Sequence, residues 1–139
     1  MLFRSRSSEL WKKLRPPVDL KGFQSALAER DAAIHAWTMF LEATPIVIMP
    51  MCAEAALPLG LDTKEAASME RLFNAAGRFL FPLPVLGLPG LSMPLGTAKN
   101  GMPVGVQIVA GRYREDLCLD AGDIIEAHEG PRQPIDPNF

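Results

Sequence analysis

The chain reads Leu91-Ser-Met-Pro-Leu95, then Lys99-Asn-Gly101, then Pro103-Val-Gly-Val-Gln-Ile-Val-Ala110. An Asn-Gly pair between two apolar runs is the strongest short-range signal for a β-hairpin, because both residues tolerate the positive φ of tight turns. We therefore predict an antiparallel hairpin. Along its second strand the side chains alternate, so Ile108 lies on one face and Gln107 on the other. Both faces are mostly apolar, and we expect both to be covered.

The segment before the hairpin combines a helix with a short strand. From Asp19, the predicted N-cap, apolar residues recur at offsets of three, four and seven, which indicates an amphipathic helix with one buried side. The members of this stripe are Leu20, Phe23, Leu27, Ile34, Trp37 and Leu41. The β-branched run over residues 46–50 predicts a strand that is buried on both faces.

Prolines and glycines divide the middle of the chain. We predict a loop over residues 53–62, a capping box from Asp62 to Glu65, and a packed helix from residue 66 that ends at Pro82. Prolines 84 and 89 argue against a regular strand between residues 83 and 90, so we expect a constrained, buried loop there.

A third helix follows the hairpin. Glu115 and Asp116 lie in its predicted first turn, where the helix dipole favours acids, and Gly130-Pro131 ends it. The domain organisation that we predict is an N-terminal helical tail over residues 1–19, one α/β domain over residues 20–130, and a C-terminal tail over residues 131–139. In the N-terminal tail a short helix over residues 8–15 stops at Pro16-Pro17.

Composition excludes several classes of protein. A length of 139 residues allows one ordinary domain, and 48% apolar with 22% charged residues is globular composition. The net charge of −2 does not favour a nucleic-acid partner, and no apolar stretch is long enough to cross a membrane. Two isolated cysteines and two histidines predict no metal site, we expect no cofactor, and a cytoplasmic location follows by default.

No self-sufficient catalytic group emerges from the spacing of the residues. Ser92 lies in Gly90-Leu-Ser-Met-Pro94, but Pro94 stands where a nucleophile elbow needs glycine, so Ser92 is interpreted as a strand residue. Asp31 and His35 are four apart on one helix, which is typical of an exposed pair. We predict no catalytic residue in this chain.

Three stretches carry a resemblance to a known family. They are Gly87-Leu-Pro-Gly-Leu-Ser-Met-Pro-Leu-Gly96, Asn100-Gly-Met-Pro-Val-Gly-Val-Gln-Ile-Val-Ala-Gly111 and Glu115-Asp-Leu-Cys-Leu119. Together they resemble the C-terminal region of the amidase signature family, with its proline- and glycine-rich turn, its G-x-P-x-G-x-Q-I strand and its acidic helix start. The family usually has Asn where this chain has Pro84, and Ala where it has Gly90.

The resemblance implies both a fold and a function. The fold class is α/β, as a C-terminal fragment of the amidase-signature mixed-sheet fold, with an antiparallel hairpin and packed helices. The implied function is the C-terminal portion of a hydrolase of linear C–N amide bonds, inactive alone because the family's Ser, cis-Ser, Lys triad belongs to an upstream stretch that nothing here matches. The implied walls of the substrate pocket are Pro50, Met51, Leu83, Pro84 and Leu86.

A hairpin that is apolar on both faces, with edges unpaired in isolation, favours association. The expected partner is an N-terminal amidase portion, or a second copy of the chain, with a small amide substrate only in the complete assembly. Two alternatives stay open. One is a non-catalytic interaction or regulatory module that dimerises or pairs with an amidase, and the other is a small hydrolase that uses Ser92.

Overall fold

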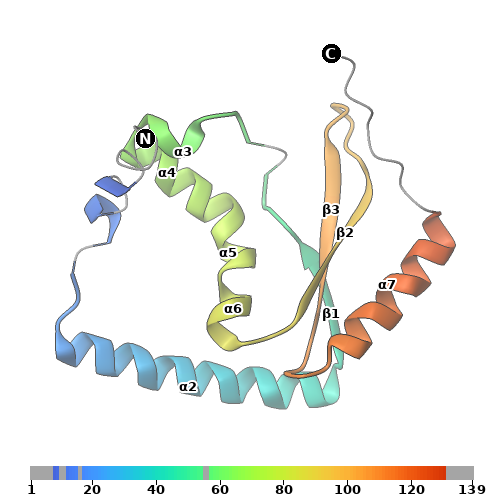
Figure 1. Ribbon diagram of the computed structural model, residues 1–139, viewed down its shortest axis with the longest axis horizontal. Coiled ribbons are helices and arrows are strands. Elements are labelled where there is room, and N and C mark those ends of the chain that lie inside the picture. Colours follow the sequence, from blue (N-terminus) through green and yellow to red (C-terminus); the bar gives the residue numbers. More distant parts are fainter. Residues whose placement is uncertain (1–7, 10–11, 16, 55–56, 131–139) are drawn as a thin grey trace.

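A computed structural model describes residues 8–9, 12–15, 17–54 and 57–130 (Figure 1). Three strands form one antiparallel sheet in the order β1-β3-β2. The strands are β1 (Ile46–Pro50), β2 (Gly90–Thr97) and β3 (Pro103–Ala110). The helices are α2 (Leu20–Ala43), α3 (Leu61–Lys64), α4 (Ala66–Leu72), the π-helix η1 (Phe73–Gly77), α5 (Arg78–Leu80), α6 (Pro82–Leu86) and α7 (Glu115–Glu129).

The predicted hairpin is confirmed. β2 and β3 pair antiparallel from Gly90 opposite Val109 to Thr97 opposite Pro103, with one irregularity in register between Pro94 and Gly96. The connecting loop is closed by a hydrogen bond of 2.8 Å from the Ala98 amide to the Met102 carbonyl. The loop lies at the free end of the hairpin, which extends beyond the helices around it (Figure 1).

Helix α7 covers one face of the hairpin, which the sequence predicted to be covered without indicating by which element. Ile108 and Ala110 of β3 and Cys118 of α7 form the buried core of this layer. Leu91 and Met93 of β2 pack against the same core. The helix approaches the sheet closely, since a Cβ placed on Gly122 would lie 2.6 Å from Leu91 Cδ2.

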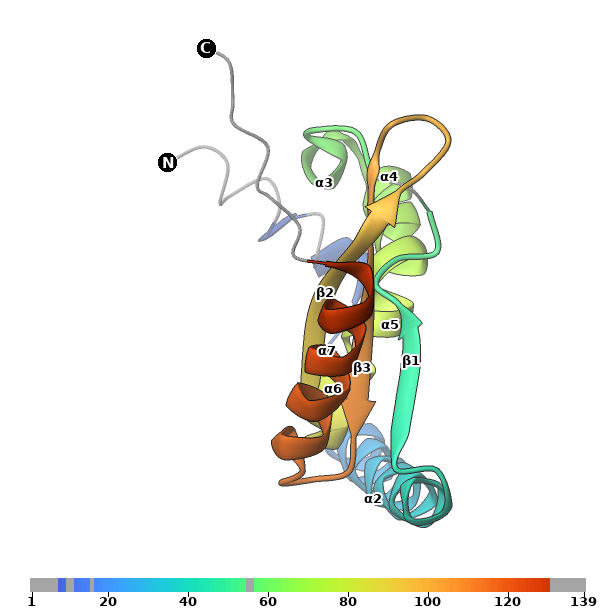
Figure 2. The same cartoon turned by 90° about the vertical axis from the view of Figure 1, so that its right-hand side faces the viewer.

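The helical segment α4–α6 lies on the opposite side of the sheet from α7 (Figures 1 and 2). Gln107 links this segment to the sheet, because its side-chain amide donates to the Phe79 carbonyl at 2.9 Å. Gln107 is 3% exposed, and Val109 on the same face is fully buried. The expectation that both faces of the hairpin are covered therefore holds near the Ala110 end of β3, whereas Val104 near the turn stays exposed.

Strand β1 does not have the expected burial on both faces. Among the described residues it pairs with β3 alone, from Ile46 opposite Ala110 to Pro50 opposite Val106, and so forms an edge of the sheet. Ile48 is 56% exposed. The physical reason is that α7 packs over β2 and β3, so that on the same face of β1 Ile46 packs against this core whereas Ile48 stays exposed.

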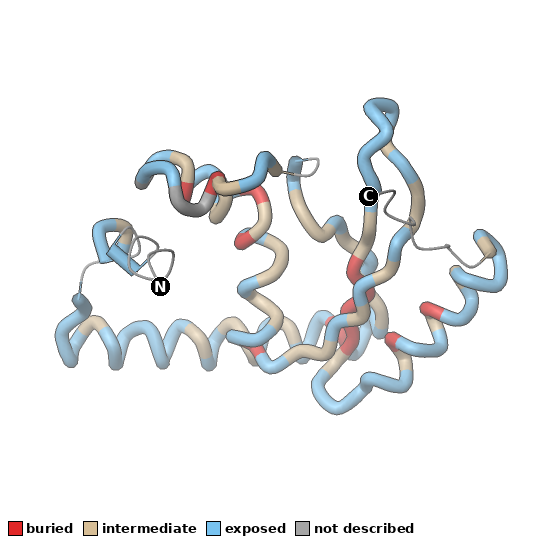
Figure 3. Tube along the Cα trace, turned by 45° about the horizontal axis from the view of Figure 1, so that its top comes forward, coloured by how far each residue is buried: buried red, intermediate tan, exposed pale blue. Residues whose placement is uncertain are grey.

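Helix α2 begins where the sequence predicted, because the Gly22 amide donates to Asp19 Oδ1 at 2.8 Å. Its apolar stripe is buried at one end only, and Figure 3 shows most of the helix in the colour of exposed residues. Leu41 is 6% exposed, whereas Leu20 and Phe23 are 72% and 56% exposed. Arg30 ties the middle of the helix to α6 through a hydrogen bond of 2.6 Å to the Val85 carbonyl.

The segment over residues 61–86 departs most from the prediction. Its first helix begins at Leu61 after Gly60 (φ +74°), so Asp62 lies inside α3 and the predicted capping box is wrong. The chain leaves the helical conformation at Glu65, and the π-helix η1 then interrupts the helix that follows. Residues 83–86 are helical, where the sequence predicted a loop. The helix is possible because Pro82 lies in the first turn of α6, where its missing N–H costs no hydrogen bond.

The terminal segments are described only in part. Residues 8–9 and 12–14 are helical and fall within the predicted helix over residues 8–15, whereas the predicted tail over residues 131–139 lies outside the described residues. Across the part of the chain that the structure describes, every helix is too short or too polar to span a bilayer.

Candidate functional site

The five predicted pocket-wall residues fall into two groups. Pro50 ends β1, is exposed, and accepts a hydrogen bond of 3.4 Å from the Gln107 side chain at its carbonyl. Met51 follows it and is half-buried beside β3, since a Cβ placed on Gly105 would lie 3.8 Å from Met51 Cγ.

The second group is carried by α6. Leu83 lies beside the start of β2, since a Cβ on Gly90 would lie 2.9 Å from Leu83 Cδ1. Pro84 is exposed and Leu86 is buried in this helix. Gly90 therefore leaves room for Leu83, which gives a physical reason for glycine at this position. The role of all five residues as a pocket wall stays a prediction.

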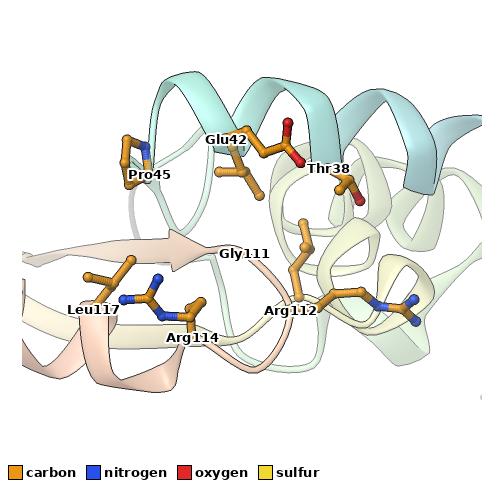
Figure 4. Close-up of a pocket in the computed structure, with 9 residues that line it drawn as sticks. Thr38, Glu42, Pro45, Gly111, Arg112, Arg114 and Leu117 are labelled. Atoms are coloured by element: carbon orange, nitrogen blue, oxygen red, sulfur yellow. The ribbon is translucent and has the colours of Figure 1, made fainter.

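A cavity that the sequence did not predict lies between the end of α2 and the turn from β3 to α7 (Figure 4). Its volume is about 340 Å³. It is lined by Thr38, Leu41, Glu42, Pro45, Leu88, Gly111, Arg112, Arg114 and Leu117. The three leucines and Pro45 provide apolar walls, and the two arginines and Glu42 add charged groups. The two arginines around the turn were the only signal in the sequence, and their spacing matches no motif.

The two arginines of this cavity do not converge on one point. Arg114 is paired with Asp116 at 2.8 Å, and this hydrogen bond raises the pKa of Arg114 and lowers the pKa of Asp116. The Arg112 guanidinium lies against Gly87, where an added Cβ would be 2.9 Å from Nη2. Figure 4 shows the two guanidinium groups extending in opposite directions. The cavity can therefore hold a small apolar group, but its arginines do not form an anion clamp.

The cavity also has no activated nucleophile among its lining residues. The only hydroxyl in the lining is that of Thr38, which donates to the Ile34 carbonyl at 2.8 Å. Nucleophilic catalysis needs a hydroxyl or thiol within hydrogen-bond reach of a base, and the nine lining residues do not provide such a pair.

A second, more polar hollow of about 450 Å³ lies beside the π-helix η1. Its strongest interaction is the ion pair between Arg71 Nη2 and Glu54 Oε2, at 2.6 Å. The hydrogen bond between the two groups lowers the pKa of Glu54 and raises the pKa of Arg71. Both charges are thus neutralised by each other, and the pair fastens the loop after β1 to helix α4.

The remaining reactive side chains are dispersed. Ser92 is an exposed strand residue opposite Gln107, which confirms its interpretation as part of a strand. His35 lies on α2, and His128 lies on α7 at 3.3 Å from Glu129 Oε1. Burial raises the pKa of the Cys118 thiol. Within the described ranges, histidine, cysteine and carboxylate side chains do not gather into a group that could hold a metal ion.

The sheet, its covering helices and the glycine- and proline-rich hairpin together form an α/β domain. The chain belongs to the amidase family, whose model matches residues 6–119. The fold class that the resemblance implied is thereby confirmed.

Relatives agree with this assignment. The chain is 42% identical over 113 residues to an indoleacetamide hydrolase of Bradyrhizobium japonicum, a match that covers 81% of this chain and 24% of that protein. It is 48% identical over 48 residues to the 6-aminohexanoate-cyclic-dimer hydrolase of Paenarthrobacter ureafaciens, a shorter match that covers 34% of this chain and 10% of that protein.

Among solved structures, 6-aminohexanoate cyclic dimer hydrolase matches with a TM-score of 0.69 and 27% identity, over 84% of this chain and 26% of that one. The chain thus spans about a quarter of the length of the indoleacetamide hydrolase and of the solved structure that it matches.

Proposed function

We propose that this chain is the C-terminal portion of an amidase-type hydrolase that acts on linear C–N amide bonds and is inactive alone. The observation that carries the proposal is the asymmetry of the structural match with the substrate-bound 6-aminohexanoate cyclic dimer hydrolase. That match covers 92% of this chain but 29% of the other. The nucleophile and its activating base would then come from the remaining portion of the fold, where the resemblance expects the Ser, cis-Ser, Lys triad.

The uncovered apolar surface of α2 supports a partner of this kind. Leu20, Phe23 and Leu27 lie on the predicted buried side of the helix, yet each is at least 45% exposed. An apolar stripe of this kind is typical of an element that packs against further protein. Strand β1 is also an edge strand, and its unpaired backbone groups could extend the sheet. We therefore place an N-terminal amidase portion against α2 and β1.

The substrate class follows from the relatives. An indoleacetamide hydrolase is named for a small open-chain amide, and we extend this class to the assembly that contains our chain. Cys52 and Cys118 are free thiols, which supports the cytoplasmic location that we expect.

The test is complementation. The chain is mixed with the N-terminal three quarters of the Bradyrhizobium indoleacetamide hydrolase, truncated where the match begins, and ammonia release from indoleacetamide is measured. We expect release from the mixture and none from either part alone. Phe23→Asp should weaken the complementation, because it puts a charge on the uncovered apolar stripe. Lys21→Asp, on an exposed position of the same helix, is the matched control and should leave it unchanged.

A second candidate function is a non-catalytic interaction or regulatory module, and the same exposed stripe on α2 favours it. It predicts a stable, stoichiometric complex without turnover, which size-exclusion chromatography with light scattering would detect. Amide hydrolysis by the purified chain alone would contradict both candidates, and loss of that hydrolysis in Ser92→Ala would assign it to Ser92.

A further inference from the structure

The turn between β2 and β3 is built around Asn100 and Gly101, and its geometry combines exposure with an activated side chain. Both residues are exposed. The Met102 amide donates to Asn100 Oδ1 at 3.2 Å, and Gly101 has φ +81° with no described atom, other than its own and those of its two chain neighbours, within 4 Å of the position of a Cβ. The turn therefore presents a polarised amide carbon next to the main-chain nitrogen of a residue that has no side chain and open space around its α-carbon.

We propose that Asn100–Gly101 is a site of spontaneous deamidation that converts this turn to aspartate and isoaspartate. The Gly101 nitrogen loses its proton and attacks Asn100 Cγ. The new N–Cγ bond forms, the Cγ–Nδ2 bond breaks, and ammonia leaves with the proton, so that a five-membered succinimide closes. No oxidant or reductant takes part.

Water then opens the succinimide in one of two ways. Cleavage of the bond between the ring nitrogen and Cγ gives aspartate at position 100. Cleavage of the bond between the nitrogen and the original main-chain carbonyl gives isoaspartate, in which the main chain runs through the side-chain carbon. Both products place a new carboxylate beside Lys99.

One hydrogen bond in the turn opposes the reaction. The Gly101 amide donates to the Ala98 carbonyl at 2.9 Å, so this bond must open before the nitrogen can attack. Hydrogen bonds at exposed loop tips open with low free energy, because few buried contacts hold them closed. The tip of this hairpin extends away from the helices around it (Figure 1).

Asn74 provides an internal comparison. It lies within the π-helix η1, and the residue after it, Ala75, is 2% exposed. The Ala75 carbonyl also accepts a hydrogen bond of 2.7 Å from the Ala53 amide. A main-chain nitrogen held in a helix beside a buried methyl group cannot reach the neighbouring side-chain carbon without local unfolding. Deamidation should therefore be faster at Asn100 than at Asn74.

Isoaspartate would change the end of the hairpin. It adds a main-chain carbon inside a loop that is closed by the Ala98–Met102 hydrogen bond, and it removes the amide group of Asn100. The pairing of Thr97 with Pro103 lies directly beside this loop and is the first part of the register that would loosen. The rest of the sheet, with Ile108 at its buried centre, lies farther from the change.

The experiment incubates the folded chain at pH 5 and pH 8 and follows peptides by mass spectrometry. Trypsin digestion at mildly acidic pH isolates the peptide that ends at Arg112, and electron-transfer fragmentation separates aspartate from isoaspartate. We expect the rate at Asn100 to exceed that at Asn74 by at least about tenfold, which is about 1.4 kcal/mol in activation free energy. We also expect it to rise with pH, since the attacking nitrogen must lose a proton.

Two variants complete the design. Asn100→Gln keeps an amide but requires a six-membered ring, so ammonia loss from this position should stop over the same period. Lys99→Gln removes the neighbouring charge and leaves the Asn-Gly pair intact, so the reaction should continue. Equal rates at Asn100 and Asn74 in the folded chain would overturn the proposal, as would an unmodified Asn100 in folded protein that deamidates only in urea.

Discussion

The side-chain amide of Gln107 donates a hydrogen bond of 2.9 Å to the main-chain carbonyl of Phe79, which lies 28 residues earlier in the chain. Phe79 belongs to α5, directly before the point where Pro82 starts a new helical turn without a main-chain donor. The same amide group reaches the Pro50 carbonyl at 3.4 Å. One buried side chain thus joins the central strand, the end of β1 and the helices on one side of the sheet.

Replacing this side chain should destabilise the fold. Gln107→Leu keeps the approximate volume but leaves two carbonyls without this donor, and we expect the free energy of unfolding to fall by about 1–3 kcal/mol. Urea denaturation followed by circular dichroism measures the change. Gln24→Leu, at an exposed position of α2, is the control and should stay within about 0.5 kcal/mol. Equal effects of the two substitutions would show that the Gln107 hydrogen bonds contribute nothing.

Gly122 sets the distance between α7 and the sheet. A Cβ at this position would lie 2.6 Å from Leu91 Cδ2 and 3.4 Å from Met93 Sδ, so in Gly122→Val either the Leu91 side chain or α7 itself must shift. Overpacking of this kind costs about 1–3 kcal/mol. Thermal denaturation should show a lower Tm than for Ala127→Val, which places the same side chain at an exposed position of the same helix. If both variants melt together, the contact between Gly122 and Leu91 does not limit the stability of the fold.

Burial of Cys118 predicts a loss of stability in alkaline solution. Its pKa is raised in the folded state, so the folded protein keeps the thiol proton when the unfolded chain releases it. Stability from this group is complete below the ordinary thiol pKa of about 8.5 and is lost as the pH rises through the higher, folded-state value. Urea midpoints measured between neutral and alkaline pH should therefore fall less in Cys118→Ala than in the parent. Ala127→Val, at an exposed position of the same helix, should retain the parent's slope.

The Glu54–Arg71 ion pair predicts a lowered pKa of Glu54, which NMR can measure directly. The hydrogen bond from Arg71 lowers the pKa of Glu54. The stabilisation of the fold by this pair is therefore present when the pH is above the ordinary glutamate pKa, and it is lost as the pH falls through the lowered pKa. Carboxyl-carbon titration should show this shift, and Arg71→Gln should return the pKa of Glu54 to the ordinary range. Arg78→Gln, at another arginine of the same hollow, should leave it lowered. An unchanged Glu54 titration in Arg71→Gln would contradict the pairing.

The elements that could be predicted from the sequence are those that local chemistry determines. The Asn100–Gly101 turn needs positive φ, Asp19 can cap its own helix, and acids favour the start of α7, so each feature depends on residues close in the chain. The burial of β1 could not be predicted in this way, because it depends on which strands α7 covers. An apolar run alone does not distinguish an edge strand from a central one.

The candidate site also combines features that depend on neighbouring residues with features that depend on distant ones. The hairpin motif identified the family, but the cavity between α2 and the β3–α7 turn joins residues from distant parts of the chain, such as Thr38 and Arg112. The helix over residues 82–86 was missed because the two prolines argued against it, although a proline in the first turn lacks no hydrogen bond. The five predicted wall residues were proposed from the family resemblance, and their role stays a prediction.

The position of β3 between β1 and β2 has a consequence for biosynthesis. A ribosome completes β1 first, but β1 has no neighbour among the described strands until β3 emerges, and Pro50 and Gln107 are 57 residues apart. The β2–β3 hairpin closes over a short loop and should form within microseconds, whereas the capture of β1 has to close a long loop. Until then the nascent chain carries an apolar strand without a paired neighbour. During this interval a chaperone, or a strand of another chain, has its best opportunity to bind β1.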